Sequence, residues 1–165
     1  MKLKYLSIIF VLLLLQFAAL SQTAIKVTPM MGSEKKLDDG QHKFFWKNGS
    51  LKTIINIKNG EHDGEHQCFY KNGKTMHTGN FNEGNRTGKW DVYSKEGDLL
   101  TQLIYVNDNI EGDYVSYYPS GKTSMIGYYN AGFKEGEFKY YNEIGDLIKT
   151  NVYSKGKKIK TIRHK

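Results

Sequence analysis

The sequence predicts an all-β fold, an elongated antiparallel meander in which five hairpin repeats of 24 residues form a single twisted sheet. Three observations lead to this prediction: glycines that recur at a fixed spacing, aromatic-rich segments of strand length between them, and turn-forming residues at the segment ends. A fixed period of this size indicates a repeat architecture. Beyond the N-terminal segment, no stretch has the apolar spacing of an amphipathic helix.

Two glycine series run through the chain at this spacing, and a third is nearly complete. The first is Gly40, Gly64, Gly88, Gly112 and Gly136; the second is Gly49, Gly73, Gly97, Gly121 and Gly145; the third is Gly60, Gly84, Gly132 and Gly156, with Asp108 at the missing place. Together they divide the chain into the repeats 40–63, 64–87, 88–111, 112–135 and 136–159.

Each repeat is expected to contain two strands. The first lies between the first two glycines of a repeat, and the second covers segments such as 50–58 and 122–130. Asn48-Gly49, Asn59-Gly60 and Asn72-Gly73 predict type I′ turns, because both central residues of that turn need a positive φ. Strands joined by tight turns pair antiparallel, so about ten strands should form one sheet in which each repeat packs mainly on its neighbours.

Two columns of the repeat are apolar or aromatic in every copy, which is typical of a stacked core. They stand five and seventeen positions after the first glycine: Phe45, Phe69, Tyr93, Tyr117 and Tyr141, then Ile57, Phe81, Tyr105, Tyr129 and Tyr153. Aromatic residues also recur two and six positions after the first glycine. Neighbouring residues along a strand point to opposite faces of the sheet, so both faces carry aromatic rings. The second aromatic face is either an exposed binding strip or a means of stiffening a single-layer sheet. The candidate binding residues are Trp46, Tyr70, Trp90, Tyr114 and Tyr118.

The N-terminal residues 1–21 are typical of a secretory signal peptide. Lys2 and Lys4 precede an apolar run from Leu6 to Leu15, and Ala19 and Ser21 are small residues before a cut at Gln22. We therefore expect export to the periplasm, the cell surface or the medium; the alternative is an uncleaved N-terminal anchor. Residues 22–39, with Pro29, are expected to be a linker or leader segment.

The formal net charge is +7, and much of the positive excess lies near the C-terminus, where residues 160–165 form a basic tail. Lys157, Lys158, Lys160 and Arg163 are the candidates for binding anionic lipid or acidic glycan. The alternative is a solvated end that keeps the last strand from pairing with another molecule. Export and the mild excess both argue against nucleic acid as a partner.

No set of residues in the repeat columns predicts catalysis, a cofactor or a metal. His62–His66 offers imidazoles and carboxylates, but it lies on a turn and a strand start. Residues 107–113 are acidic but lack the ligand spacing of a calcium loop. Cys68 is the only cysteine, so an intrachain disulfide is excluded and a small buried side chain is expected.

A family resemblance appears in the segment Gly112–Lys122, with its pattern Gly-x-aromatic-x-x-Tyr-Tyr-x-x-Gly-Lys, and in the segment 127–138 that follows. These segments resemble the MORN-repeat variant of bacterial proteins, and the similarity extends over 40–156. The resemblance implies a protein-interaction or lipid-associated module without catalytic residues; some members carry the label of a YwqK-type antitoxin. Asp108 departs from the pattern, so a local irregularity is expected at 106–109.

The sequence thus favours an exported, non-enzymatic scaffold that binds another protein. Binding of anionic lipid or acidic glycan is the alternative. An antitoxin-like role is less favoured, because an antitoxin usually meets its toxin in the cytosol.

Overall fold

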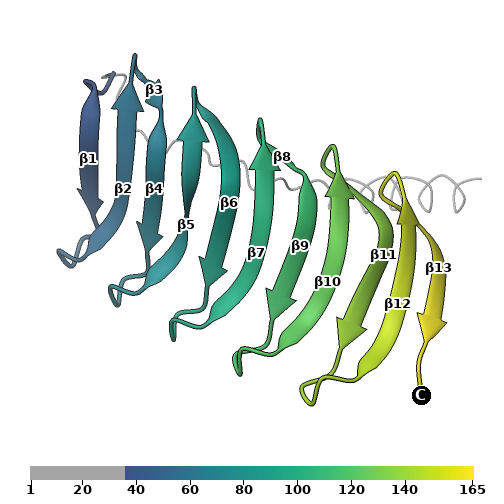
Figure 1. Cartoon of the computed structure of the whole chain (residues 1–165). Helices are drawn as coiled ribbons and strands as arrows, with labels where there is room; N and C mark the ends of the chain where they lie inside the picture. Colours follow the sequence, from purple (N-terminus) through teal and green to yellow (C-terminus); the bar gives the residue numbers. More distant parts are fainter. Residues whose placement is uncertain (1–35) are drawn as a thin grey trace, which may run out of the picture. The chain divides into compact units, whose positions relative to one another are not determined.

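The computed structural model describes residues 36–165, and this part of the chain is built from β-strands joined by turns (Figure 1). The expected signal peptide, 1–21, and most of the expected linker, 22–39, lie outside the described residues. Within 36–165, no helix has the length and apolar character that crossing a membrane requires.

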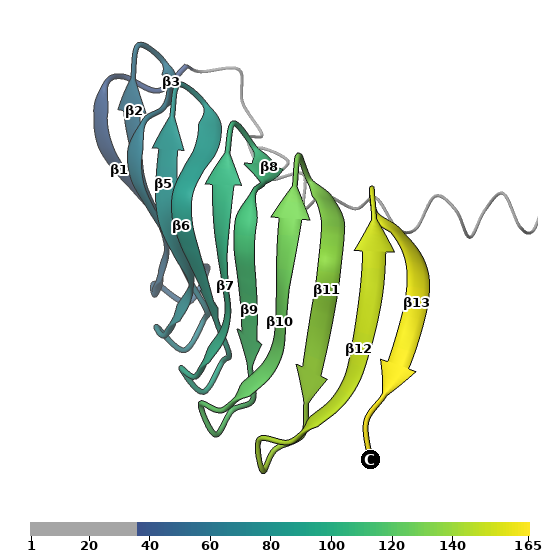
Figure 2. The same ribbon diagram turned by 45° about the vertical axis from the view of Figure 1, so that its right-hand side comes forward.

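Thirteen strands belong to one sheet, and every pair of neighbours is antiparallel. Along the sheet the order is β1 (Gly40–Phe45), β2 (Leu51–Lys58), β4 (Gly64–Phe69), β5 (Thr75–Asn82), β6 (Asn85–Tyr93), β7 (Leu99–Val106), β9 (Gly112–Tyr117), β10 (Thr123–Asn130), β11 (Phe133–Tyr141), β12 (Leu147–Ser154) and β13 (Lys157–Arg163). The short strands β3 (Glu61–His62) and β8 (Asn109–Ile110) pair with β2 and β7. The predicted meander of hairpin repeats is confirmed, and Figure 2 shows its strands in one twisted layer.

The register repeats with the glycines. In each repeat the first glycine pairs with the residue seventeen positions later, as in Gly64↔Phe81 and Gly88↔Tyr105. This pairing places the residues two and seventeen positions after the first glycine on one face, which we call the ring face. It comprises His42, His66, Trp90, Tyr114 and Phe138 with Ile57, Phe81, Tyr105, Tyr129 and Tyr153. The opposite side of the sheet is the reverse face.

The column five positions after the first glycine does not form the expected core stack. A register shift separates it from the fourth position, as between Phe44 and Phe45, and Phe45 is 60% exposed. Tyr117 instead donates its hydroxyl hydrogen to Gln102 Oε1 at 2.7 Å. Positions two and four lie on the ring face, so strand alternation points the fifth position to the reverse face.

Tight turns close the hairpins at one end of the sheet. At 59–60, 83–84, 107–108, 131–132 and 155–156, both central residues have positive φ, as in Asn59 (55°) and Gly60 (80°). The I′ prediction for Asn59-Gly60 is confirmed.

The I′ predictions for Asn48-Gly49 and Asn72-Gly73 are wrong. In the first of these loops only Gly49 has a positive φ, of 83°. Its amide donates to Trp46 O at 2.9 Å, while Trp46 N donates to Ser50 O at 2.8 Å. This is a three-residue hairpin loop with a left-handed glycine, and the Asn48 side chain accepts a hydrogen bond from Ser50 N instead of turning the chain.

The turn at Asp108 is regular, contrary to the irregularity expected there. Asn107 and Asp108 have φ angles of 48° and 65°, and Asp108 N donates to Arg86 O at 3.1 Å. The Arg86 guanidinium and backbone amide both bind the Asp108 carboxylate, at 2.8 and 2.9 Å. Arg86 therefore holds in place the residue that replaces glycine. Although partial burial opposes it, this bonding leaves the pKa of the Asp108 carboxyl below its usual value.

Candidate interaction surfaces

Edge-to-face ring contacts run across the ring face. Trp90 lies between Phe81 and Tyr105 at centroid distances of 5.4 and 5.7 Å, and Phe138 lies between Tyr129 and Tyr153 at 5.5 and 5.1 Å. Trp90 is 5% exposed and Phe138 is fully buried. The structure thus places Trp90, one of the candidate binding residues, in the core.

Two strand glycines make room for these rings. A Cβ on Gly79 would lie 2.2 Å from the Trp90 ring, and one on Gly127 would lie 2.3 Å from the Phe138 ring. Both stand fifteen positions after the first glycine, in the second and fourth repeats. Their role was not predicted, although their spacing of two repeats is a visible signal in the sequence.

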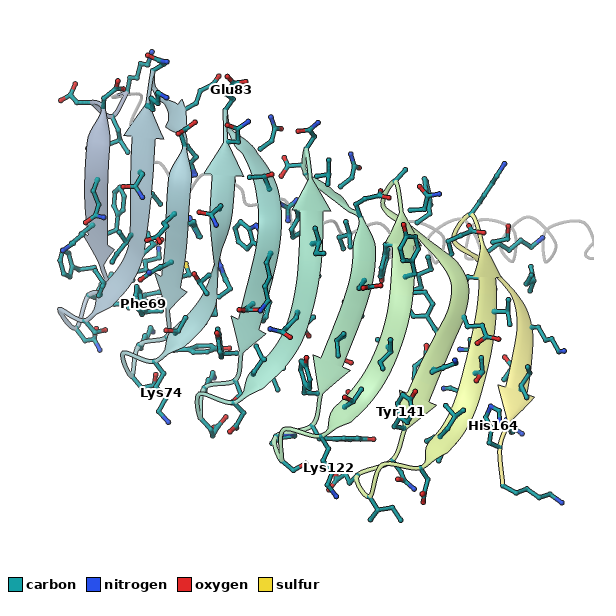
Figure 3. All side chains as sticks on the ribbon, viewed as in Figure 1. Phe69, Lys74, Glu83, Lys122, Tyr141 and His164 are labelled. Carbon is teal, nitrogen blue, oxygen red and sulfur yellow. The ribbon has the colours of Figure 1, made fainter. Side chains whose placement is uncertain are left out.

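Trp46, Tyr70 and Tyr118 share a structural contact at the loop end of the sheet. Trp46 Nε1 donates to Phe69 O at 3.1 Å, Tyr70 Oη to Tyr93 O at 2.8 Å, and Tyr118 Oη to Tyr141 O at 2.7 Å. Each acceptor lies 23 residues after its donor. It therefore belongs to the next repeat, where it stands five positions after the first glycine. In Figure 3, Phe69 and Tyr141 lie toward this end, where Lys74 and Lys122 mark two of the loops, while Glu83 lies at the opposite end. These side chains link successive repeats.

Tyr114 is half-buried on the ring face, where its ring packs against Tyr129 at 5.6 Å. Burial raises the pKa of Tyr129 to about 12, and Tyr114 and other nearby tyrosines add to the increase. Burial likewise raises the pKa of Tyr105. The phenols of Tyr105 and Tyr129 therefore stay neutral at physiological pH.

The reverse face exposes an apolar group that the sequence analysis did not single out. Ile104, Ile126 and Tyr128 are 38%, 41% and 45% exposed on β7 and β10; we call them the reverse-face patch. Columns that are aromatic in every repeat are visible in the sequence, whereas this patch occupies columns that are polar in the second repeat, at Thr78 and Asn80.

Charged residues lie next to the apolar side chains of the reverse-face patch, and Asp113 on β9 lies between β7 and β10. Lys89 pairs with Ile104, Asp113 with Tyr128 and Lys139 with Ile126 across neighbouring strands. Lys89 Nζ lies 3.6 Å from Asp91, and Lys139 Nζ lies 3.3 Å from Glu137. Exposed apolar side chains interspersed with charges of both signs suit contact with another protein.

The four candidate basic residues lie on the edge strand β13. Lys157, Lys158, Lys160 and Arg163 are all exposed, and β13 pairs only with β12 in the described sheet. Residues 160–163 of the expected basic tail are therefore part of a strand. Charged side chains on an edge oppose pairing with another strand, and they also present positive charge to an anionic surface.

The two segments considered for metals have other arrangements. The rings of His62 and His66 lie 6.2 Å apart, and His66 lies beside Cys68 and His77 instead, with ligand atoms of these three within 4.8 Å of one another. In the acidic segment 107–113, Arg86 binds Asp108 and the Glu111 carboxylate accepts the Ala131 amide at 2.6 Å.

Comparison with known proteins identifies the repeat family. The profile of the MORN repeat variant matches residues 38–59, 63–83 and 110–131. No curated protein matches the chain significantly. A solved structure of the Glycosylation Associate Protein (Gap123) complex from Streptococcus agalactiae is similar, with a TM-score of 0.38 and 19% identity over 67% of this chain and 20% of the other. This chain thus corresponds to about a fifth of that chain's length. The third and fifth repeats, which the profile does not match, keep the same register, so three of the five repeats match the MORN repeat variant and the others share their pairing pattern.

Proposed function

We propose that this chain is an exported, non-enzymatic scaffold that binds another protein in the cell envelope or outside the cell. The observation that carries the proposal is the reverse-face patch, where three large apolar side chains are exposed among charged ones. MORN repeats are in general non-catalytic, which supports the scaffold role. The signal-like residues 1–21 support export.

The patch suits a protein partner because of its composition. Ile and Tyr lose ordered water when they are covered, and Tyr can keep a hydrogen bond at its hydroxyl. The neighbouring residues Lys89, Asp113 and Lys139 carry both signs of charge, which favours a partner with complementary charges over a uniformly anionic surface.

A second candidate function is binding of anionic lipid or acidic glycan through β13. The observation that favours it is the exposure of its four basic side chains along one sheet edge. Such binding depends on long-range charge attraction, so salt weakens it strongly.

The proposal is tested by using this protein to capture binding partners from an envelope extract, at low and at high salt. In the patch variant, Ile104, Ile126 and Tyr128 are each replaced by Thr, which keeps strand preference while removing apolar surface. The matched control replaces Ile144 and Ile159, which are 76% and 62% exposed elsewhere, by Thr. A third variant replaces Lys157, Lys158, Lys160 and Arg163 by Gln.

The proposal predicts a protein that is retained at high salt by the wild type and the Ile144/Ile159 control, and lost by the patch variant. Equal capture by the patch variant would reject this surface. Retention at low salt alone, with lipid or glycan in the eluate and loss in the Gln variant, would establish the second candidate instead. Export is tested separately, by fractionating the host and sequencing the N-terminus of the protein.

A further inference from the structure

His66, Cys68 and His77 form a cluster of metal-ligand side chains on the ring face. Cys68 on β4 pairs directly with His77 on β5, and His66 lies two residues before Cys68, so its side chain points to the same face. A ligand atom from each of the three lies within 4.8 Å of the other two. A tetrahedral zinc ion holds its ligand atoms about 3.5 Å apart, so side-chain rotations of about an ångström would bring the three onto one ion.

The two imidazoles are packed closely within an aromatic enclosure. The His66 and His77 rings stack with centroids 5.3 Å apart and an interplanar angle of 7°. Phe81 lies 5.3 Å from His66, and Trp90 lies 5.7 Å from His66 and 5.8 Å from His77. Phe81 belongs to the same repeat as the cluster and Trp90 to the next one, and His66 is only 5% exposed.

Both histidines carry a nitrogen that lacks a partner. Within residues 36–165, Nδ1 of His66 and Nδ1 of His77 are buried without a hydrogen bond. A neutral imidazole offers one donor and one acceptor, and a buried polar atom that bonds to nothing costs about 1–3 kcal/mol. Two such nitrogens in stacked rings favour a bound ligand. Rotation of both rings toward an ion would give these nitrogens a partner.

The protonation state of the histidines suits coordination. Burial, together with the nearby His77 and His62, lowers the pKa of His66 to about 4, and burial also lowers the pKa of His77. Both rings are therefore neutral at physiological pH, the form in which imidazole binds a metal.

The ligand set belongs to the second repeat. The three columns stand two, four and thirteen positions after the first glycine. In the other repeats they hold His42, Phe44 and Thr53; Trp90, Val92 and Thr101; Tyr114, Ser116 and Met125; and Phe138, Tyr140 and Lys149. The second repeat alone holds three metal-ligand side chains at these places.

We propose that His66, Cys68 and His77 bind one Zn²⁺ ion through two imidazole nitrogens and the Cys68 thiolate. Zinc favours nitrogen and sulfur ligands in a tetrahedron, and three protein ligands leave the fourth position for water or another ligand. Binding releases the thiol proton. The ion joins β4 to β5 and replaces the missing partners of the two rings.

Titration of the full chain tests the site, with protein purified without a polyhistidine tag, stripped by chelator and kept reduced with a non-thiol reductant. Calorimetry with Zn²⁺ measures stoichiometry and affinity. Absorption with Co²⁺ as the probe reports a thiolate-to-metal charge-transfer band. The variants are Cys68→Ser and His77→Phe. The matched control is His42→Gln, which removes a histidine from the same column in the first repeat; circular dichroism without metal verifies that each variant folds.

The proposal predicts one Zn²⁺ per chain, a charge-transfer band with Co²⁺, and a rise in melting temperature on adding Zn²⁺. Cys68→Ser should lose the band. Both ligand variants should bind more than about tenfold more weakly, since loss of residues that merely support a ligand already costs about 10–100-fold. His42→Gln should behave as wild type. Wild-type protein that binds no Zn²⁺, or that binds it equally well after Cys68→Ser, would overturn the proposal.

Discussion

At the scale of single residues, the left-handed turn positions are held by bonds from the preceding repeat. Five residues occupy the first turn position with φ between 47° and 55°: Asn59, Glu83, Asn107, Ala131 and Lys155. A carboxylate one repeat earlier accepts the amide of three of them: Asp63 for Glu83, Glu111 for Ala131 and Glu135 for Lys155. Residues with little preference for this conformation are thus tolerated, because neighbouring repeats fix the turn.

Ala131→Asn should raise the free energy of unfolding by about 0.5–1 kcal/mol, because Asn adopts the left-handed conformation more readily than Ala. The amide of residue 131 and its bond to Glu111 remain. Urea denaturation followed by circular dichroism measures the change. Asn59→Ala, the reverse exchange at the equivalent turn, should lower the stability by a similar amount; a loss of stability in Ala131→Asn would contradict this account.

Tyr118→Phe should lower the free energy of unfolding by about 0.5–1.5 kcal/mol, the net value of one hydrogen bond. The change removes the hydroxyl that donates to Tyr141 O and keeps the ring. Tyr128→Phe is the control, because the Tyr128 hydroxyl makes no hydrogen bond within residues 36–165. This substitution should leave the free energy of unfolding unchanged. Equal melting temperatures for both variants would show that the Tyr118 bond does not stabilise the sheet.

At the scale of strands and hairpins, close packing between neighbouring strands determines which residues are essential. Phe138 on β11 covers Gly127 on β10, and Trp90 on β6 covers Gly79 on β5. The register skips at both glycines, between Thr78 and Asn80 and between Ile126 and Tyr128. The ring and the glycine therefore act as one packing unit.

Gly127→Ala should lower the free energy of unfolding by about 1–3 kcal/mol, the usual cost of overpacking. The added Cβ would overlap the Phe138 ring. Phe138→Ala alone should cost about 3–5 kcal/mol through the cavity it leaves. The double variant should cost less than the sum, because the alanine at 127 then has room. Strict additivity in denaturant unfolding would show that the two residues do not form a packing unit.

The strand elements were predictable from the sequence, whereas the roles of many side chains were not. Glycine spacing and Asn-Gly chemistry are local properties, so the meander and the turn at Asn59-Gly60 followed from them. Trp90 is a core residue and Tyr118 a link between repeats, and both roles depend on contacts with neighbouring strands and repeats. The cluster of His66, Cys68 and His77 depends on the pairing of β4 with β5. The sequence pattern pointed to the segment 62–66 instead, which contains only one of these three residues.

At the scale of the whole array, each repeat contacts its neighbours through one strand pair and a few cross-repeat bonds. The links from Trp46, Tyr70 and Tyr118 each extend to the next repeat and no further. The free energy of unfolding should therefore approximate a sum over repeats and their interfaces. A substitution within one repeat should leave the packing two repeats away unchanged.

Combining Gly79→Ala with Gly127→Ala tests this directly. The glycines lie on β5 and β10, four strand spacings or roughly 19 Å apart, and they share no ring. The loss of unfolding free energy in the double variant should equal the sum of the single losses within about 0.5 kcal/mol. The coupled pair of Gly127 and Phe138 serves as the contrast within the same protein. A comparable coupling between the two glycines would mean that strain passes along the sheet, and the description of the array as a sum of neighbouring terms would fail.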